Sequence, residues 1–177
     1  KVEPSEAPSP RSALLSLKSS DGTVVETILV VQRPVSFDES DLVFRVDPAI
    51  STNSKGVVLP IYAITAPVTI DWGDGEKTEL TAALTTSTRY PAHKYEDTGR
   101  QYDVVVKGNV TNLQGTSASY VAGVTEIAQW GTANVYTIVK IKSSAITYLP
   151  GTKGNEFAKV TAFDFASNPK LVNLSPD

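Results

Sequence analysis

Short apolar segments separated by turn residues run through residues 35–114, and this spacing constrains the fold more than any other feature. Tyr102, Val104 and Val106 occupy every second position, so their side chains would face one side of a strand. Few windows in this region keep the 3.6-residue period of a helix. The pattern therefore predicts an all-β fold built on an antiparallel β-sandwich.

A chain reversal is predicted inside the segment "VTIDWGDGEKTEL" (Val68–Leu80). Asp74-Gly75 is a dipeptide that a type I′ turn prefers, because both central positions of that turn need a positive φ angle. Gly73 permits a bend directly after the strand, and Trp72 can cover the end of the core with its large ring. Each residue of this motif therefore has a structural role that needs no ligand.

The acidic side chains around this reversal offer one alternative. Asp71, Asp74 and Glu76 carry the oxygen atoms that Ca²⁺ prefers as ligands, but their spacing does not match the acidic loop of an EF-hand. Both aspartates can instead accept backbone N–H groups within the turn. We favour the structural interpretation and predict no metal ligand, with a weak Ca²⁺ site as the alternative.

The motifs of residues 36–112 resemble those of PKD domains, which are immunoglobulin-like (Ig-like) modules. That family has a strand ending in Trp-Gly-Asp-Gly, then His-x-Tyr before a glycine, then a Tyr-x-Val-x-Val strand. These positions correspond here to Trp72, Gly73, Asp74, Gly75, His93, Tyr95, Gly99, Tyr102, Val104 and Val106. The chain departs from the pattern at Arg100-Gln101, where threonine is frequent, and in the long polar connection "TAALTTSTRYPA". The resemblance implies an extracellular spacer or recognition module without catalytic activity.

Residues 1–34 predict a linker followed by a β-hairpin. "KVEPSEAPSP" is proline-rich, as linkers often are, and Asp21-Gly22 is a turn signal between two alternating apolar segments. The closing segment "ILVVQRP" resembles the end of BACON domains, Ig-like modules in surface and secreted proteins of gut Bacteroidetes. The resemblance implies the remnant of a preceding domain; the alternative is an ordinary hairpin of the sandwich that follows.

In residues 115–177, apolar segments recur about two dozen residues apart. "YTIVKIKSSAITYLP" and "AKVTAFDFASNPKLVNLSP" share one form, which predicts a short β-rich segment of leucine-rich-repeat type. Asn168 or Asn173 would form the asparagine ladder of such a solenoid. "VTEIAQWGTANVYTIVKI" resembles the start of the BspA-like leucine-rich repeats of bacterial surface proteins, through Ile127, Trp130 and Gly131. The resemblance implies adhesion to host proteins by a truncated or minimal solenoid.

The chain offers little for catalysis. His93 is the only histidine and cysteine is absent, which excludes a His or Cys metal cluster and a thiol nucleophile. No Gly-x-Ser-x-Gly motif is present for a serine nucleophile. Asp38, Glu39 and Asp41 could supply the carboxylate pair of a glycoside hydrolase, but such a segment is more typical of a solvated sheet edge. We expect no enzyme activity, no cofactor and a structural role for His93.

Aromatic residues are the better candidates for ligand binding. Trp130, Asn134 and Tyr136 lie within a few residues of one another, and an exposed indole with nearby polar groups could stack on a sugar ring. The alternative, which we favour, is that Trp130 is buried where the sandwich meets the repeat-like segment. The exposure of its side chain distinguishes the two interpretations.

Charge and composition limit the classes of partner that the chain is expected to bind. The chain has 16 Lys and Arg against 19 Asp and Glu and no basic block, so nucleic acid is not an expected partner. No apolar run is long enough to cross a bilayer, and no transmembrane segment is predicted in this chain. Because methionine is absent even from position 1, we expect a processed or excised part of a longer protein.

Together these features predict a non-enzymatic, monomeric module at the bacterial cell surface or in the extracellular space. The sandwich would act as a rigid spacer, and the partner would be a host protein or a polysaccharide. The alternatives are a carbohydrate-binding accessory module of a glycan-utilisation system, and a purely structural spacer or virion component.

Overall fold

The computed structural model describes residues 11–32, 37–81, 90–117, 119–142, 145–171 and 173–174 of the chain. The chain divides into two compact units, Lys1–Phe37 and Asp38–Asp177. Strands hold 39% of the residues and helix 2%, so the predicted all-β sandwich is confirmed. The first unit ends close to the boundary expected after Pro34, and the linker expected over residues 1–10 lies outside the described residues.

A β-hairpin forms a two-stranded sheet in the first unit. β1 (Arg11–Lys18) pairs antiparallel with β2 (Val24–Gln32). The carboxylate of Asp21 accepts the N–H of Thr23 at 2.9 Å, and Gly22 adopts a positive φ of 86°. The expected reversal at Asp21-Gly22 is confirmed, and in the part of the chain that the structure describes no other strand joins this sheet.

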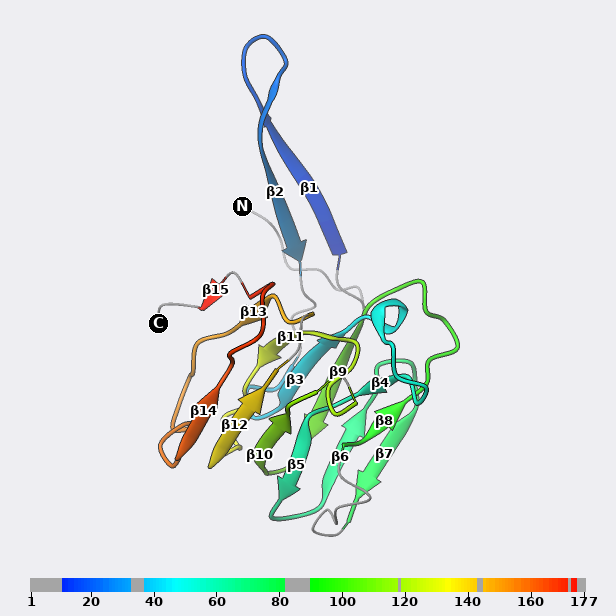
Figure 1. Cartoon of the computed structure of the whole chain (residues 1–177), viewed down its shortest axis with the longest axis vertical. Helices are drawn as coiled ribbons and strands as arrows, with labels where there is room; N and C mark the ends of the chain where they lie inside the picture. Colours follow the sequence, from blue (N-terminus) through cyan, green and yellow to red (C-terminus); the bar gives the residue numbers. More distant parts are fainter. Residues whose placement is uncertain are drawn as a thin grey trace. The chain divides into compact units, whose positions relative to one another are not determined.

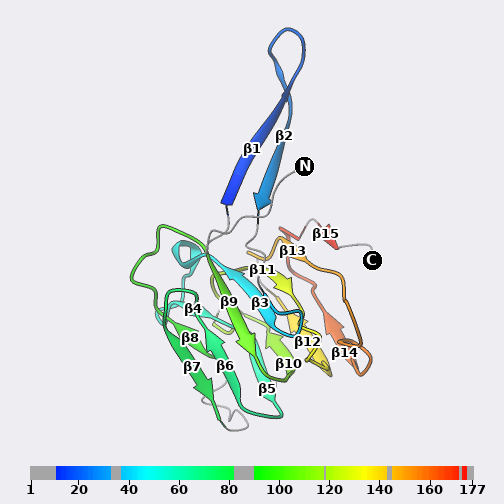
Figure 2. The same cartoon turned by 180° about the vertical axis from the view of Figure 1, so that it is seen from behind.

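Residues 38–177 form two main sheets, seen from opposite sides in Figures 1 and 2. The larger sheet has the order β15-β13-β11-β3-β9-β6-β7. Its strands are β3 (Leu42–Val46), β6 (Val68–Asp71), β7 (Lys77–Leu80), β9 (Tyr102–Lys107), β11 (Val124–Gln129), β13 (Tyr148–Leu149) and β15 (Asn173–Leu174).

The smaller main sheet has the order β14-β12-β10-β5. Its strands are β5 (Ile61–Ile64), β10 (Val110–Gly115), β12 (Ile138–Ile141) and β14 (Ala162–Asp164). A further pair joins β4 (Val57–Val58) to β8 (Ala92–His93), and a 3₁₀ helix (Pro48–Ile50) follows β3. These shorter elements connect the strands of the two main sheets along the chain.

The hydrophobic core lies between the two main sheets. Tyr102, Val104 and Val106 of β9 are buried, whereas the residues between them are less so, and the expected alternation is confirmed. On the neighbouring strand β3, Leu42 pairs with Val106 and Phe44 with Val104, so both strands bury side chains on the same face. The same core cluster continues through β11 and β12 to Leu149.

The strands after β9 alternate between the two sheets. β12 adds to β10 and β14 adds to β12 in the smaller sheet, while β13 adds to β11 and β15 to β13 in the larger one. All four of these pairs are parallel. Residues 110–174 thus wind as a coil that contributes one strand to each sheet per full turn. We call this region the coil segment (Figure 1).

The strand pairs described before β11 are antiparallel, and every parallel pair includes a strand that follows residue 114. Residues 38–177 form one compact unit, without a division at the boundary expected between residues 114 and 115. The physical reason is that β10 and β11 belong to both parts. β10 pairs antiparallel with β5 on one side and parallel with β12 on the other, and β11 is placed likewise between β3 and β13.

Asparagine side chains stabilise the turns of the coil. The side-chain amide of Asn168 donates to the carbonyl of Ile141 in the preceding coil at 2.7 Å and to that of Phe165 at 2.8 Å. Asn168 is buried, so its amide satisfies carbonyl groups that water cannot reach. Asn168 thus contacts the preceding coil, as one member of such a ladder would, while the side chain of Asn173 lies outside the described residues.

Candidate functional site

The Trp-Gly-Asp-Gly motif forms the loop between β6 and β7. The N–H of Trp72 donates to the carbonyl of Glu76 at 3.0 Å, which closes the loop and confirms the chain reversal. Gly73 and Gly75 have φ angles of 82° and 104°, whereas Asp74 is absent from the residues with positive φ in the described part of the chain. The loop is therefore longer than the type I′ turn that Asp74-Gly75 predicted.

Both aspartates of this loop bind backbone groups. A carboxylate oxygen of Asp71 accepts the N–H of Gly73 at 3.1 Å, and one of Asp74 accepts the N–H of Glu76 at 3.1 Å. These are the contacts that the structural interpretation of the motif predicts. Among the described residues, no group of three or more His, Cys, Asp or Glu side chains could hold a metal ion.

His93 joins this loop to an aromatic stack. Its Nε2 lies 2.6 Å from a carboxylate oxygen of Asp74, and its ring stacks on Trp72 with centroids 4.9 Å apart. The edge of Tyr95 meets the histidine ring at 4.5 Å, and Tyr95 stacks on Tyr102 at 4.1 Å. The motif residues thus meet in one partly buried cluster, which we call the aromatic stack.

The polar atoms of the aromatic stack have partners within the protein. The hydroxyl of Tyr95 donates to the carbonyl of Trp72 at 2.8 Å, and burial raises the pKa of this hydroxyl. Burial by itself would raise the pKa of Asp74, but the hydrogen bonds from His93 and from the Glu76 N–H outweigh it, so the pKa is lowered. Each group has a structural partner, as in a packed corner of a sandwich.

A polar hollow of about 470 Å³ lies outside the aromatic stack. It is lined by Asp74, Glu76, His93, Lys94, Glu96, Asp97, Arg100 and Tyr102. The Arg100 guanidinium lies 4.5 Å from the centre of the Tyr102 ring and pairs with the exposed Asp97. Gly99 N–H in turn donates to the Asp97 carboxylate at 2.8 Å, so this loop is held by its own contacts.

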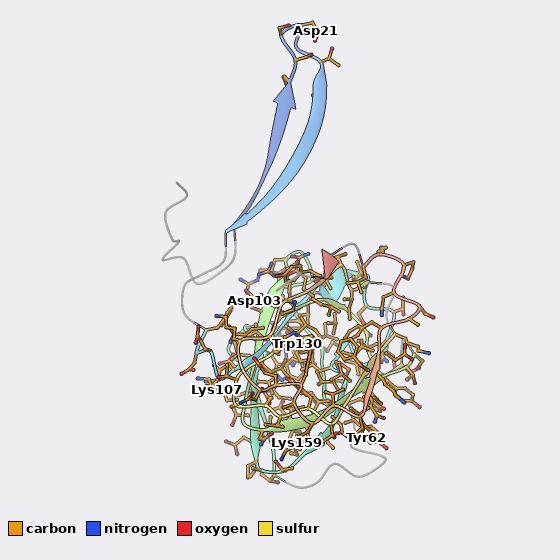
Figure 3. The ribbon with its side chains drawn as sticks, turned by 90° about the vertical axis from the view of Figure 1, so that its left-hand side faces the viewer. Asp21, Tyr62, Asp103, Lys107, Trp130 and Lys159 are labelled. Atoms are coloured by element: carbon orange, nitrogen blue, oxygen red, sulfur yellow. The ribbon has the colours of Figure 1, made fainter. Side chains whose placement is uncertain are left out.

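Trp130, Asn134 and Tyr136 do not form an exposed platform, and that expectation is wrong. Their exposed fractions are 2%, 0% and 0%, and Figure 3 shows Trp130 inside the body of residues 38–177. The indole N–H donates to the carbonyl of Pro150 at 2.8 Å, and the ring meets the edge of Phe157 at 4.8 Å. Trp130 is thus buried where the coil segment joins the rest of the sandwich, as the favoured alternative predicted.

The polar side chains beside Trp130 have partners within the protein. The amide of Asn134 donates to the Trp130 carbonyl at 3.0 Å and accepts the N–H of Val110 at 2.8 Å. The hydroxyl of Tyr136 also donates to the Trp130 carbonyl, at 2.6 Å, and burial raises its pKa. The buried carboxylate of Glu156 accepts backbone N–H groups at 3.0 and 2.7 Å. These side chains bind the backbone rather than a ligand.

The acidic residues before β3 differ in their exposure to solvent. Asp38 and Glu39 are exposed, whereas Asp41 is buried and burial raises its pKa. Glu39 forms an ion pair with Lys153 at 2.8 Å, and Asp38 accepts the N–H of Ser40 at 2.9 Å. These contacts give Asp38 and Glu39 structural partners at the start of the sandwich.

A buried charge cluster lies between three strands of the larger sheet. The Arg45 guanidinium contacts the Asp103 carboxylate at 3.0 Å and that of Glu126 at 3.4 Å. Only 2% of the Arg45 side chain is exposed. β3, β9 and β11 each contribute one member, so the cluster joins three neighbouring strands of the sheet.

Three tyrosines that the sequence did not single out form an aromatic group at the surface. Tyr90 and Tyr120 stack with centroids 4.5 Å apart and planes 24° apart, and Tyr62 lies 6.0 Å from Tyr90. Tyr120 is 43% exposed, and the other two are partly exposed. We call these residues the tyrosine surface; Figure 3 shows Tyr62 at the periphery of the molecule.

The backbone holds the tyrosine surface in place. Tyr62 is in β5, Tyr90 precedes β8, and Tyr120 is in the connection from β10 to β11. Tyr90 has a φ of 72°, a conformation that costs free energy for a residue other than glycine. Its N–H donates to the Ile61 carbonyl at 3.2 Å, and Asn53 donates its amide to the Ser119 carbonyl at 3.3 Å. Strained backbone of this kind clusters at binding sites.

No match was found when the chain was compared with models of protein families, with curated proteins and with solved structures. Among the described residues, no helix has the length and the apolar character needed to cross a membrane.

Proposed function

We propose that this chain is a non-catalytic binding module of a surface or secreted protein, and that its ligand is a glycan bound at the tyrosine surface. The observation that carries the proposal is the stacked pair of Tyr90 and Tyr120, with Tyr62 beside it. The motif resemblance to PKD domains supports an extracellular spacer, and the rigid double sheet supports a scaffold that holds loops at fixed positions.

The chemistry of the tyrosine surface suits a sugar ring. A saccharide presents a flat face of C–H groups that packs on an aromatic ring, and its hydroxyl groups need hydrogen-bond partners nearby. Tyr90 and Tyr120 stack on each other, so one face of each ring is covered, and the Tyr120 ring, 43% exposed, offers its outer side to a sugar. Phenolic hydroxyls can both donate and accept hydrogen bonds. A single pair of rings buries little ligand surface, so weak binding per site is expected.

The test measures binding to an array of plant, mucin and bacterial polysaccharides, followed by calorimetry on the best ligand. Tyr120→Ala removes the most exposed ring and is expected to weaken binding roughly tenfold, equivalent to about 1.4 kcal/mol. Phe163→Ala is the matched control, because Phe163 is 50% exposed but lies outside the tyrosine surface. The control is expected to bind like the unmodified chain.

Two results would overturn the glycan assignment. One is equal glycan binding by the Tyr120→Ala and Phe163→Ala variants. The other is the absence of any glycan signal together with Tyr120-dependent binding to an extracellular-matrix protein such as fibronectin or collagen, which would assign the same surface to a host protein.

A further inference from the structure

One sequence pattern recurs along the coil segment. An apolar residue followed by threonine begins successive half turns, in the pairs Val110-Thr111, Val124-Thr125, Tyr136-Thr137, Ile146-Thr147 and Val160-Thr161. In the smaller sheet the full pattern is apolar-Thr-x-apolar, as in "VTNL", "YTIV" and "VTAF". The pattern therefore includes β10, which the sequence alone assigned to the sandwich.

The threonines stack from coil to coil. The N–H of Thr137 donates to the Thr111 carbonyl at 2.8 Å, and that of Thr161 to the Thr137 carbonyl at 2.9 Å. The hydroxyl of Thr161 also donates to the Thr137 carbonyl, at 3.1 Å. Thr147 makes the same two contacts to Thr125 in the larger sheet, at 2.8 and 3.3 Å. Each coil thus sets the position of the next through the same contact.

In the part of the chain that the structure describes, the apolar positions form a column whose last member is exposed. Leu113 pairs with Val139, and Val139 pairs with Phe163, so the three occupy equivalent places in successive strands. Leu113 and Val139 are 0% exposed, whereas Phe163 is 50% exposed. Phe163 contacts Phe157 and Phe165 at centroid distances of 5.4 and 4.9 Å. The last position of the column is therefore an exposed aromatic group on β14.

β14 is also the last strand of its sheet in the described part of the chain. We propose that this edge is a docking surface for an extended peptide of another protein that carries the pattern apolar-Thr-x-apolar, added to β14 as a parallel strand. The preceding coils show the required occupant, because a strand of this pattern covers Leu113 and another covers Val139. Main-chain hydrogen bonds supply affinity at such an edge, and the alternating side chains supply specificity.

Charge refines the expected partner. The position after the column residue is occupied by Gln114, Lys140 and Asp164 in successive strands. Asp164 already pairs with Lys142 of the adjacent coil at 3.3 Å. A peptide with lysine or arginine at this position would place a second cation beside the Asp164 carboxylate. The sequence "YTIVKIKS" of residues 136–143 has this arrangement and serves as a probe.

The experiment measures fluorescence anisotropy of the labelled "YTIVKIKS" peptide against the full chain. Binding is expected, and a peptide of the same composition with apolar and polar positions exchanged is expected to bind at least tenfold more weakly. Phe163→Asp is expected to abolish binding. Ile50→Asp is the matched control, since Ile50 is 46% exposed on the 3₁₀ helix and lies outside the coil segment.

A second measurement keeps the test independent of the folding of the Phe163 variant. In the unmodified chain, the peptide is expected to slow amide hydrogen exchange in β14 and to leave exchange in β7 unchanged. Three outcomes would overturn the proposal: equal binding of both peptides, binding that Phe163→Asp does not change, and no added protection of β14. Concentration-dependent dimerisation abolished by Phe163→Asp, without peptide binding, would instead assign the edge to a second copy of the chain.

Discussion

Asp74 is the residue on which the corner between β6, β7 and β8 depends. Its carboxylate accepts the Glu76 N–H within the loop and contacts His93 on a strand 19 positions later. One side chain thus closes a loop and anchors the aromatic stack to it. Because these hydrogen bonds lower the pKa of Asp74, the charged form is the one that stabilises the fold.

Asp74→Asn is expected to lower the free energy of unfolding by about 1–2 kcal/mol at pH 7. The folded-state pKa lies below the ordinary value of 3.8, so the contribution is complete above that pH and is lost as the pH falls through the folded pKa. Urea denaturation of both proteins at pH 7 and near pH 2.5 checks this. The difference between them is expected to shrink at the lower pH.

Asp71→Asn serves as the control, because the Asp71 side chain is 35% exposed and its ion pair with Lys77 is solvated. Asp71→Asn is expected to lower the free energy of unfolding by less than Asp74→Asn does at pH 7. A pH-independent difference between Asp74→Asn and the unmodified chain would contradict the role given to the charged carboxylate.

At the scale of elements, the β6–β7 loop shows why its glycines are not equivalent. A Cβ atom on Gly73 would lie 2.7 Å from the Asp103 carbonyl of the adjacent strand, whereas one on Gly75 would meet no atom within 4 Å. Both glycines have positive φ angles. Gly73 is thus required by backbone conformation and by a close strand approach, and Gly75 by conformation alone.

Gly73→Ala is therefore expected to destabilise the chain by more than about 2 kcal/mol, and Gly75→Ala by about 1 kcal/mol. The two variants share the cost of a left-handed backbone and differ in the clash with β9. Thermal unfolding followed by circular dichroism compares them directly. Equal effects would show that the loop moves away from Asp103 without cost.

Local sequence patterns predicted the strands and turns correctly but did not predict which strands pair with one another. The alternation of Tyr102, Val104 and Val106 and the turn signals at Asp21-Gly22 and Asp74-Gly75 depend on adjacent residues, and these strands and reversals are confirmed. Which strands pair depends on contacts between distant residues, and a single sequence does not encode them in any local period. The double membership of β10 and β11 was missed for this reason.

The candidate site was predicted less well than the fold. The composition around Trp130 matches a sugar platform and also a buried junction, and only the packing of Pro150 and Phe157 distinguishes them. Tyr62, Tyr90 and Tyr120 come from three separate segments, and none lies in a recognisable motif. Tyr90 lies in the long polar connection "TAALTTSTRYPA", which departs from the PKD pattern.

At the scale of the whole molecule, residues 38–177 are expected to unfold as one unit. The core cluster runs from β3 to β13 without interruption, and the buried charge cluster joins β3, β9 and β11. A fragment of residues 38–114 would lack β11 and would expose one edge of β3. The boundary between residues 114 and 115, where the sequence pattern changes, thus lies within a single hydrophobic core.

The fragment of residues 38–114 is expected to give no cooperative thermal transition, whereas residues 38–177 are expected to give a single one. Differential scanning calorimetry of the two fragments checks this, with circular dichroism to detect residual strand content. A sharp transition of the shorter fragment near the temperature of the longer one would show that the sandwich is independent of the coil segment.

β10 and β11 belong both to the sandwich and to the coil segment, and this affects the order in which the chain folds. Arg45 of β3 and Asp103 of β9 are 58 positions apart, and this pairing aligns the strands on which β11, β13 and β15 are built. Such distant pairing is slow, while each coil closes a much shorter loop. The coils can therefore form rapidly once their template exists, one after another from β10 outward. Loss of the strand pairs within residues 38–114 therefore removes the template for every coil.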